Sequence, residues 1–142
     1  MVAVSWREPA GVLLERAEAG WGGLWSLTLC AGAAALSLSA VVSPEAELRL
    51  LEVAADLNAA LLQVEAVHPE VLTDAVAVDL GPVVDTRFVA VAVAATLIDE
   101  ATRRAMALTH TLGLGMGELL ALARVQPLLA SARAGVLVGV SP

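Results

Sequence analysis

Three side chains of this sequence belong to types that carry nucleophilic or metal chemistry: Cys30, His68 and His110. Cys30 is the only cysteine, so no internal disulfide and no zinc site built from several cysteines can form. Catalysis by the Cys30 thiol needs a histidine base beside it, and a cysteine within an apolar run is usually a buried, inert thiol. The two histidines also lack the close i, i+4 pairing of helical metal ligands. We therefore predict no catalytic, metal or cofactor site, and no enzymatic activity.

Four aspartates could form paired carboxylates for acid and base work: Asp74, Asp79, Asp85 and Asp99. They lie at expected strand ends and helix caps, where aspartate commonly hydrogen-bonds to nearby backbone amides. The segment from Gly113 to Gly117 looks like an anion-binding loop, but it follows a helix and holds no Lys, Ser or Thr. A hinge or a helix-packing site is expected there instead.

The composition is unusually apolar for a chain of this length. Its 142 residues suit one domain, which we expect to cover residues 1–142. The apolar fraction is 58% and the mean hydropathy is +0.80, whereas typical soluble domains are about 45 to 50% apolar. One small core cannot hide all of this surface, so we expect a protein partner or client, or a second copy of the chain, to cover the remainder.

The charge balance is acidic. Fifteen Asp and Glu residues face eight basic residues, all of them arginine, and the net charge is -7. Duplex nucleic acid would be repelled by this charge, so no nucleic-acid partner is expected. The single cysteine favours a reducing compartment, and we predict a cytoplasmic location.

The uncharged stretch from Trp21 to Pro44 is long enough to span a bilayer. Against a membrane helix, glycines interrupt it, no basic cluster flanks it, and its Ser and Thr residues recur at strand spacing. Alternation over residues 24–30 and 36–40 favours a β-hairpin that turns near Gly32. The sequence does not decide between a β-hairpin and a membrane helix for this stretch, but the membrane helix is the less favoured of the two.

Two helices are expected around this stretch. The first runs through Val12 and Arg16 and ends before Gly20. The second begins at Ser43 and Pro44, a cap and first-turn pair followed by glutamates that suit the helix dipole. Its end is left open, although His68 before a proline is biased away from helix.

The second half of the chain carries the clearest strand patterns. Residues 76–80 and 88–95 alternate Val or Leu with smaller residues, and both read as strands. Asp99 is expected to cap the next helix, which should break near Gly113, and Pro127 should punctuate a short last helix. The predicted fold class is therefore α+β, a two-layer antiparallel sheet packed against helices.

A strand with valines on one face and alanines on the other is apolar on both sides, so it should be central or lie in an interface. We predict that two copies meet through the strand at residues 88–95 and the helix after Asp99. The expected interface residues are Phe88, Val89, Val91, Val93, Ala101, Ala105 and Leu108.

The expected order of elements resembles the chaperones of type III secretion and the related YbjN-like domains. The matching stretches are Leu24–Val42, Ser43–Leu61 with Asp56, Leu57 and Asn58 in its middle, Val76–Leu97, and the chain from Asp99 onward. Only two strands precede the middle helix, where the family usually has three. The resemblance implies a homodimer that holds a client segment on its apolar surface, without catalysis or nucleotide. No residue roles carry across.

Two functional hypotheses follow. The first is a non-enzymatic, chaperone-like protein-binding module that is homodimeric and presents apolar surface to a client. The alternative is a structural subunit of a larger viral or envelope assembly, in which the surplus apolar surface would be permanently buried.

Overall fold

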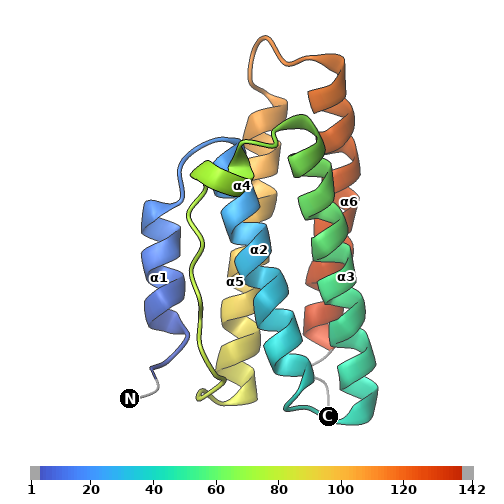
Figure 1. The fold of residues 1–142 in the computed structure, drawn as a ribbon. Helices are drawn as coiled ribbons and strands as arrows, with labels where there is room; N and C mark the ends of the chain where they lie inside the picture. The colour runs from blue at the N-terminus through green and yellow to red at the C-terminus, as the bar shows by residue number, and fades with distance from the viewer. Residues whose placement is uncertain (1–3, 139–142) are drawn as a thin grey trace.

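The computed structural model describes residues 4–138, and over that range the chain is helical, with no β-strand. Four long helices lie side by side as a bundle, and a short N-terminal helix lies along its outside (Figure 1). The helices are α1 (Arg7–Arg16), α2 (Trp21–Ser39), α3 (Pro44–Val67), α4 (Val71–Asp74), α5 (Arg87–Thr109) and α6 (Met116–Val138).

The four long helices form a ring in which each packs against two neighbours. α2 contacts α3 and α5, and α6 contacts the same two helices from the other side. Neighbours run antiparallel, whereas the diagonal pair α3 and α5 runs the same way (Figure 1). The chain must therefore return along the bundle between α3 and α5, which makes this an antiparallel four-helix bundle with one long crossover connection. The crossover consists of α4 and residues 75–86 and lies between α1 and α2 (Figure 1).

The predicted α+β fold with a two-layer antiparallel sheet is wrong, because the strand predicted at residues 88–95 belongs to α5. Its alternation of Val and Ala coexists with a helical period: Ala90, Ala94, Leu97, Ile98 and Ala101 are all buried. A short apolar run cannot distinguish a strand from a buried helix, and length has to decide. α5 runs for 23 residues without Gly or Pro, and its cap is Thr86 rather than Asp99.

The predicted β-hairpin over residues 24–40 is likewise wrong, because this stretch is α2. Leu24, Leu27, Ala31, Ala34 and Leu38 are buried at helical spacing, and they place α2 against both of its neighbours. Twelve of the 19 residues of α2 are buried, and its exposed residues Ala33 and Leu36 are apolar, so it lacks the polar face that would have revealed its period.

The strand predicted at residues 76–80 is also absent, since this part of the crossover is extended chain without a sheet partner. It is fixed to the bundle through Trp6, whose indole Nε1 donates to the carbonyl of Gly81 at 3.1 Å. Asp85 accepts hydrogen bonds from the Ser5 hydroxyl at 2.6 Å and from the backbone amide of Trp6 at 2.8 Å. These hydrogen bonds therefore fix the segment before α1 to the end of the crossover.

Several boundaries set by local chemistry are confirmed. α3 has Ser43 as its N-cap and Pro44 in its first turn, and it ends at Val67, before the His68 cap. α1 ends before Gly20, and the chain turns between α5 and α6 where Gly113 has a φ of 83°. Pro127 does not end the last helix, because α6 continues through it to Val138.

Pro127 offers a test of helix strain. It lies inside α6 and is exposed, so its replacement leaves no cavity. Pro127→Ala should raise the free energy of unfolding by about 1 to 3 kcal/mol, because it restores a backbone hydrogen bond and removes the ring's clash with the preceding turn. Chemical denaturation measures this change. An unchanged or lower stability would mean that α6 carries no strain at this position.

Candidate functional site

A hollow of about 320 Å³ opens at one end of the bundle, between the α1–α2 connection, the start of α2, and α4. We call it the end pocket. Its lining residues include three acidic residues, one histidine, one tryptophan and one serine, together with small apolar residues. They are Ala17, Glu18, Ala19, Trp21, Gly22, Gly23, Ser26, His68, Glu70, Val71, Asp74, Ala75 and Val76.

The wall from residues 17–19 is held in place by an arginine of α5. Arg104 Nη1 donates to the carbonyl oxygens of Ala17 at 3.0 Å and Glu18 at 2.6 Å. Glu100, one turn earlier on α5, accepts from Arg104 Nε at 2.9 Å and so orients the guanidinium. Two backbone carbonyls on one charged donor fix this connection firmly, since charge-assisted hydrogen bonds are the stronger kind.

Gly23 allows the same connection to lie directly on α2. A Cβ atom at this position would overlap the carbonyl oxygen of Glu18 and lie 2.9 Å from its carbonyl carbon. Both atoms belong to the backbone, so a side chain could not be accommodated by a rotamer change. The absence of a side chain at Gly23 therefore sets the shape of the end pocket.

His68 joins four elements at the edge of the pocket. Its Nδ1 lies 2.6 Å from Glu70 Oε1 and its Nε2 lies 2.8 Å from Glu118 Oε2, at the start of α6. Its ring stacks on the indole of Trp21, the first residue of α2, with 4.7 Å between ring centroids. His68 itself caps the end of α3, so it connects α2, α3, α4 and α6.

The protonated form of His68 is favoured. Burial disfavours the imidazolium, but the hydrogen bonds and charges of Glu118 and Glu70 outweigh it and raise the pKa of His68 above 6.5. The pKa of Glu70 is lowered by its own backbone amide and by His68. The pKa of Glu118 is lowered by the backbone amide of Gly115 and by His68. When His68 is protonated, the cluster places one cation between two carboxylates.

This cluster predicts a pH dependence of stability. The pKa of His68 is raised in the folded state, so its contribution is fully present below the unfolded value and is lost as the pH rises through the folded value. Because both glutamates are accessible to solvent, screening keeps this contribution small. The difference in unfolding free energy between the wild type and His68→Gln should therefore be larger at about pH 6 than at about pH 8. An equal difference at both pH values would contradict this prediction.

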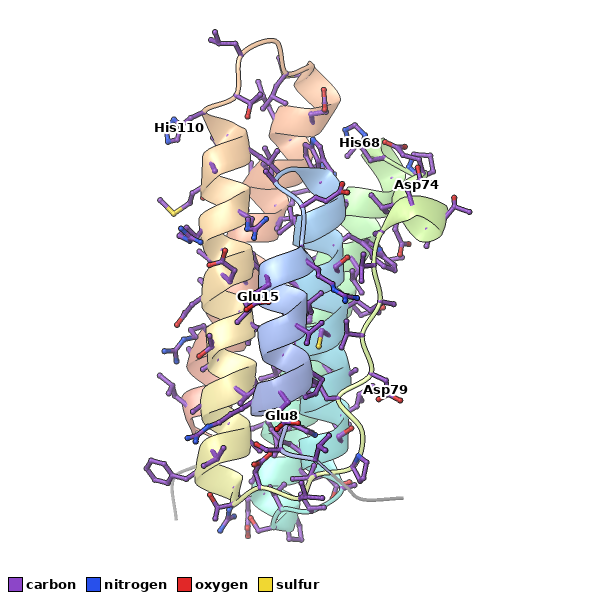
Figure 2. All side chains as sticks on the ribbon, turned by 90° about the vertical axis from the view of Figure 1, so that its left-hand side faces the viewer. Glu8, Glu15, His68, Asp74, Asp79 and His110 are labelled. Carbon is purple, nitrogen blue, oxygen red and sulfur yellow. The ribbon has the colours of Figure 1, made fainter. Side chains whose placement is uncertain are left out.

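Cys30 lies in the middle of α2 and is buried. Burial, with a smaller contribution from the charge of Asp79, raises the pKa of the thiol from 9.0 to about 11. Such a thiol is a poor nucleophile at neutral pH. His110 is exposed just after α5, at the same end of the molecule as His68 but on its other side (Figure 2). The structure therefore does not bring the three residues together.

The predicted aspartates also lie apart. Asp74 ends α4 in the pocket wall, and Asp79 accepts from the amide of Gly81 at 2.9 Å, which is a turn contact. The hydrogen bonds from the Ser5 hydroxyl and the Trp6 amide lower the pKa of Asp85. Asp99 lies inside α5 and pairs with Arg133 of α6 at 2.8 Å.

Most of the predicted interface residues lie inside the molecule. Five of them are buried in the bundle core: Val91, Val93, Ala101, Ala105 and Leu108. Val89 is half-buried, whereas Phe88 is 76% exposed. Of the predicted set, Phe88 is thus the most accessible to a partner.

The turn between α5 and α6 projects beyond the ends of α2 and α3 (Figure 1). It carries exposed apolar side chains, and no Asp, Glu, Lys or Arg occurs between Arg104 and Glu118. Leu112 is 96% exposed and Met116 is 72% exposed. We call the exposed apolar residues here the hairpin tip; they are Leu112, Met116, Leu119 and Leu120.

Within residues 4–138, no group of three or more His, Cys, Asp or Glu side chains is placed to hold a metal ion. In the same range, α2 is the one helix long and apolar enough to cross a membrane, with a mean hydropathy of 1.3. The most apolar 18-residue stretch of α2 is 67% buried inside the bundle. This burial is typical of the core helix of a bundle.

Comparison with known proteins found no match to a family model, a curated protein or a solved structure. The segments that carried the resemblance to secretion chaperones include predicted strands that are helical here.

Proposed function

We propose that this chain is a non-enzymatic protein-binding module that holds its partner at the hairpin tip. The observation that carries the proposal is the exposure of Leu112 and Met116, at 96% and 72%, at a projecting end of the bundle. Four large apolar side chains gathered at one place differ from the single exposed apolar residues that are normal on protein surfaces. The acidic charge of the chain keeps it dispersed without covering this patch.

The tip suits a protein partner for two further reasons. Leucine and methionine have flexible side chains that adapt to a partner groove or helix, and methionine is common on such surfaces. The glycines at 113, 115 and 117 add no side chains to the turn, which reduces steric competition when the apolar residues are buried by a partner. A rigid helical pair then presents a small adaptable surface.

A double substitution tests this proposal. Leu112→Glu with Met116→Glu adds two charges to the tip without disturbing the core, because both side chains are exposed. Partner binding should weaken at least about tenfold, since each buried leucine or methionine contributes about 1.5 to 3 kcal/mol. The measurement compares proteins that copurify with each tagged variant, followed by affinity measurement on the purified partner.

The matched control is Leu48→Glu on α3, where the side chain is 67% exposed. α3 begins at the end of the bundle opposite the tip (Figure 1). A partner that binds the tip should be retained by this variant and lost from the tip variant. Equal retention by both variants would contradict the proposal.

We also propose that two copies associate beside Phe88. A groove between α5 and α6 is lined by Phe88, Val91, Ala92, Ala95, Thr96, Asp99, Arg133 and Leu137. Phe88 at this groove is 76% exposed. A large exposed aromatic side chain beside an apolar groove supports a contact with a second copy.

Light scattering tests self-association. The wild type should have a mass near twice 14.5 kDa, and Phe88→Glu should lower it to that of the single chain. Folding should be unaffected, since Phe88 is exposed. A monomeric wild type would reject the dimer, and a mass of many copies would instead favour the structural-subunit hypothesis.

A further inference from the structure

We propose that His68 is a pH-sensitive switch that fixes the start of α6 when its ring is protonated and releases it when the ring is neutral. Three residues of the hairpin tip, Met116, Leu119 and Leu120, lie in the first turns of α6. The switch therefore controls how rigidly the tip is held. Its effect on α6 follows from the contacts of His68, whereas its consequence for a partner rests on the proposed function.

Both ring nitrogens of His68 lie at hydrogen-bonding distance from a carboxylate oxygen. Nδ1 is 2.6 Å from Glu70 Oε1, and Nε2 is 2.8 Å from Glu118 Oε2. The pKa values of both glutamates are lowered, so near neutral pH both carboxylates are ionised and only accept hydrogen bonds. Only the imidazolium donates from both nitrogens, because the neutral ring keeps a single N–H. One of the two contacts is therefore lost when the proton leaves.

The contact with Glu118 is the one that we expect to break. Glu70 is two positions from His68 in the chain, so their contact orders little additional chain, whereas Glu118 is 50 positions away. Glu118 also keeps a second partner, since its Oε1 accepts from the backbone amide of Gly115 at 3.0 Å. The neutral ring then retains its proton on Nδ1, and the lone pair of Nε2 repels Glu118.

Glu118 connects His68 to the start of α6. Gly115 directly precedes the helix, and its carbonyl accepts from the amide of Leu119 at 3.1 Å. A glutamate at the third helical position that accepts from the amide of the capping residue forms half of a capping box. One oxygen of Glu118 thus caps α6, and the other holds α6 to the end of α3 through His68.

The turn at residues 110–118 has few other polar attachments to the bundle. Outside the helices themselves, its other hydrogen bonds among the described residues stay within the hairpin of α5 and α6. The contact with His68 is the one in that part of the chain that joins the turn to a different helix. Its loss should loosen the first turn of α6, although Leu114 still packs against the core.

The other charges around His68 are mostly acidic. Glu18 of the α1–α2 connection and Asp74 of α4 line the same pocket, whereas the first turn of α2 presents an indole ring and no charge. Glu65, one turn earlier on α3, accepts from an indole of α2 at 3.0 Å. Arg104 of α5 donates to backbone carbonyls of the connection. These surroundings favour the imidazolium and leave Glu70 and Glu118 as its direct partners.

The direction of the switch follows from the same contacts. Burial disfavours the imidazolium, but Glu118 and Glu70 outweigh it and raise the pKa of His68 above 6.5. The start of α6 is therefore fixed at pH values below 6.5, and it is released as the pH rises through the raised pKa.

Carbon-detected nuclear magnetic resonance of the intact chain, from about pH 5 to about pH 9, tests the switch. The ring signals of His68 and His110 report when each histidine loses its proton. The backbone carbon shifts of Gly115 and Met116 should change with the midpoint of His68. The nitrogen shifts of the neutral His68 ring should show its proton on Nδ1. The wild-type titration gives this result without any substitution.

The variant that removes the switch is His68→Gln, and its matched control is His110→Gln. His110 lies at the same end of the molecule but on its other side (Figure 2). Glutamine does not titrate, so the shifts of Gly115 and Met116 should be independent of pH in His68→Gln and unchanged from the wild type in the control. Three outcomes would overturn the proposal: wild-type tip shifts that do not change with pH, shifts that follow the midpoint of His110, or a titration that persists in His68→Gln.

A binding experiment separates this inference from the proposed function. A partner at the hairpin tip should bind about fivefold more tightly at about pH 6 than at about pH 8, because a fixed tip loses less freedom on binding. His68→Gln should remove the difference, and His110→Gln should keep it. If no partner binds the tip, the protein-binding proposal fails while the carbon shifts still decide the switch. A partner whose affinity does not depend on His68 would overturn the regulation of the tip.

Discussion

Gly23→Ala is expected to lower the free energy of unfolding by about 3 kcal/mol or more, because the added methyl group has no space. It would overlap the carbonyl oxygen of Glu18 and lie 2.9 Å from the carbonyl carbon. Overpacking of side chains usually costs about 1 to 3 kcal/mol, and here the obstacle is backbone. Moving that backbone also lengthens the contacts from Arg104 to the same connection.

Gly11→Ala is the matched control for this substitution. Gly11 lies inside α1, and a Cβ atom there would meet nothing within 4 Å. Alanine should therefore raise stability by about 0.5 to 1 kcal/mol through helix propensity. Urea denaturation measures both changes. If Gly23→Ala were as well tolerated as Gly11→Ala, the α1–α2 connection could not lie on α2 as described.

Trp6→Ala should have an effect of similar or larger size, about 3 to 5 kcal/mol of destabilisation. The Trp6 side chain is fully buried and is the largest fully buried side chain in the structure described. Its loss removes apolar contact and the hydrogen bond to Gly81 together. Because Trp6 holds the crossover against the bundle, protease cleavage within residues 75–86 should also become faster.

Trp6→Phe separates the two contributions. Phenylalanine keeps part of the buried ring but leaves the Gly81 carbonyl without its donor, so about 1 to 3 kcal/mol should be lost. The order of stability is then wild type, Trp6→Phe and Trp6→Ala. A Trp6→Ala protein with the stability of the wild type would show that the N-terminal segment does not pack on the crossover.

Local chemistry in the sequence located the start of α3 and indicated a bias away from helix at its end. Ser43 and Pro44 begin α3 because a cap and a proline act within one turn. His68 ends it because the following proline disfavours helix at that residue. Such signals depend only on neighbouring residues, but a long helix can override them, since Asp99 lies inside α5 and Pro127 inside α6.

The strand predictions failed because α2 is mostly buried and because the exposed positions at the start of α5, Phe88 and Ala92, are apolar. A polar stripe normally shows a helical period, and these segments lack one. Residues 88–95 consist almost entirely of Val and Ala. In such a run Val and Ala can alternate without indicating a strand. Continuous length without Gly or Pro was the better indicator, since α5 has 23 residues and strands are usually five to six.

The end pocket could not be predicted from local patterns. His68 and Glu118 are 50 positions apart, and Arg104 and Glu18 are 86 apart. Only the bundle topology brings α3, α6 and the α1–α2 connection to one end. The apolar, glycine-containing stretch from Leu112 to Gly117 was visible in the sequence, but its projection from the bundle was not.

Site-specific photo-crosslinking tests the central functional claim most directly. A photoreactive phenylalanine derivative would replace Leu112 at the hairpin tip in one protein and Leu48 on α3 in another, both exposed positions. We expect a discrete crosslinked partner from position 112 and none from position 48. The same crosslinks from both positions, or crosslinks from position 48 alone, would contradict binding at the hairpin tip.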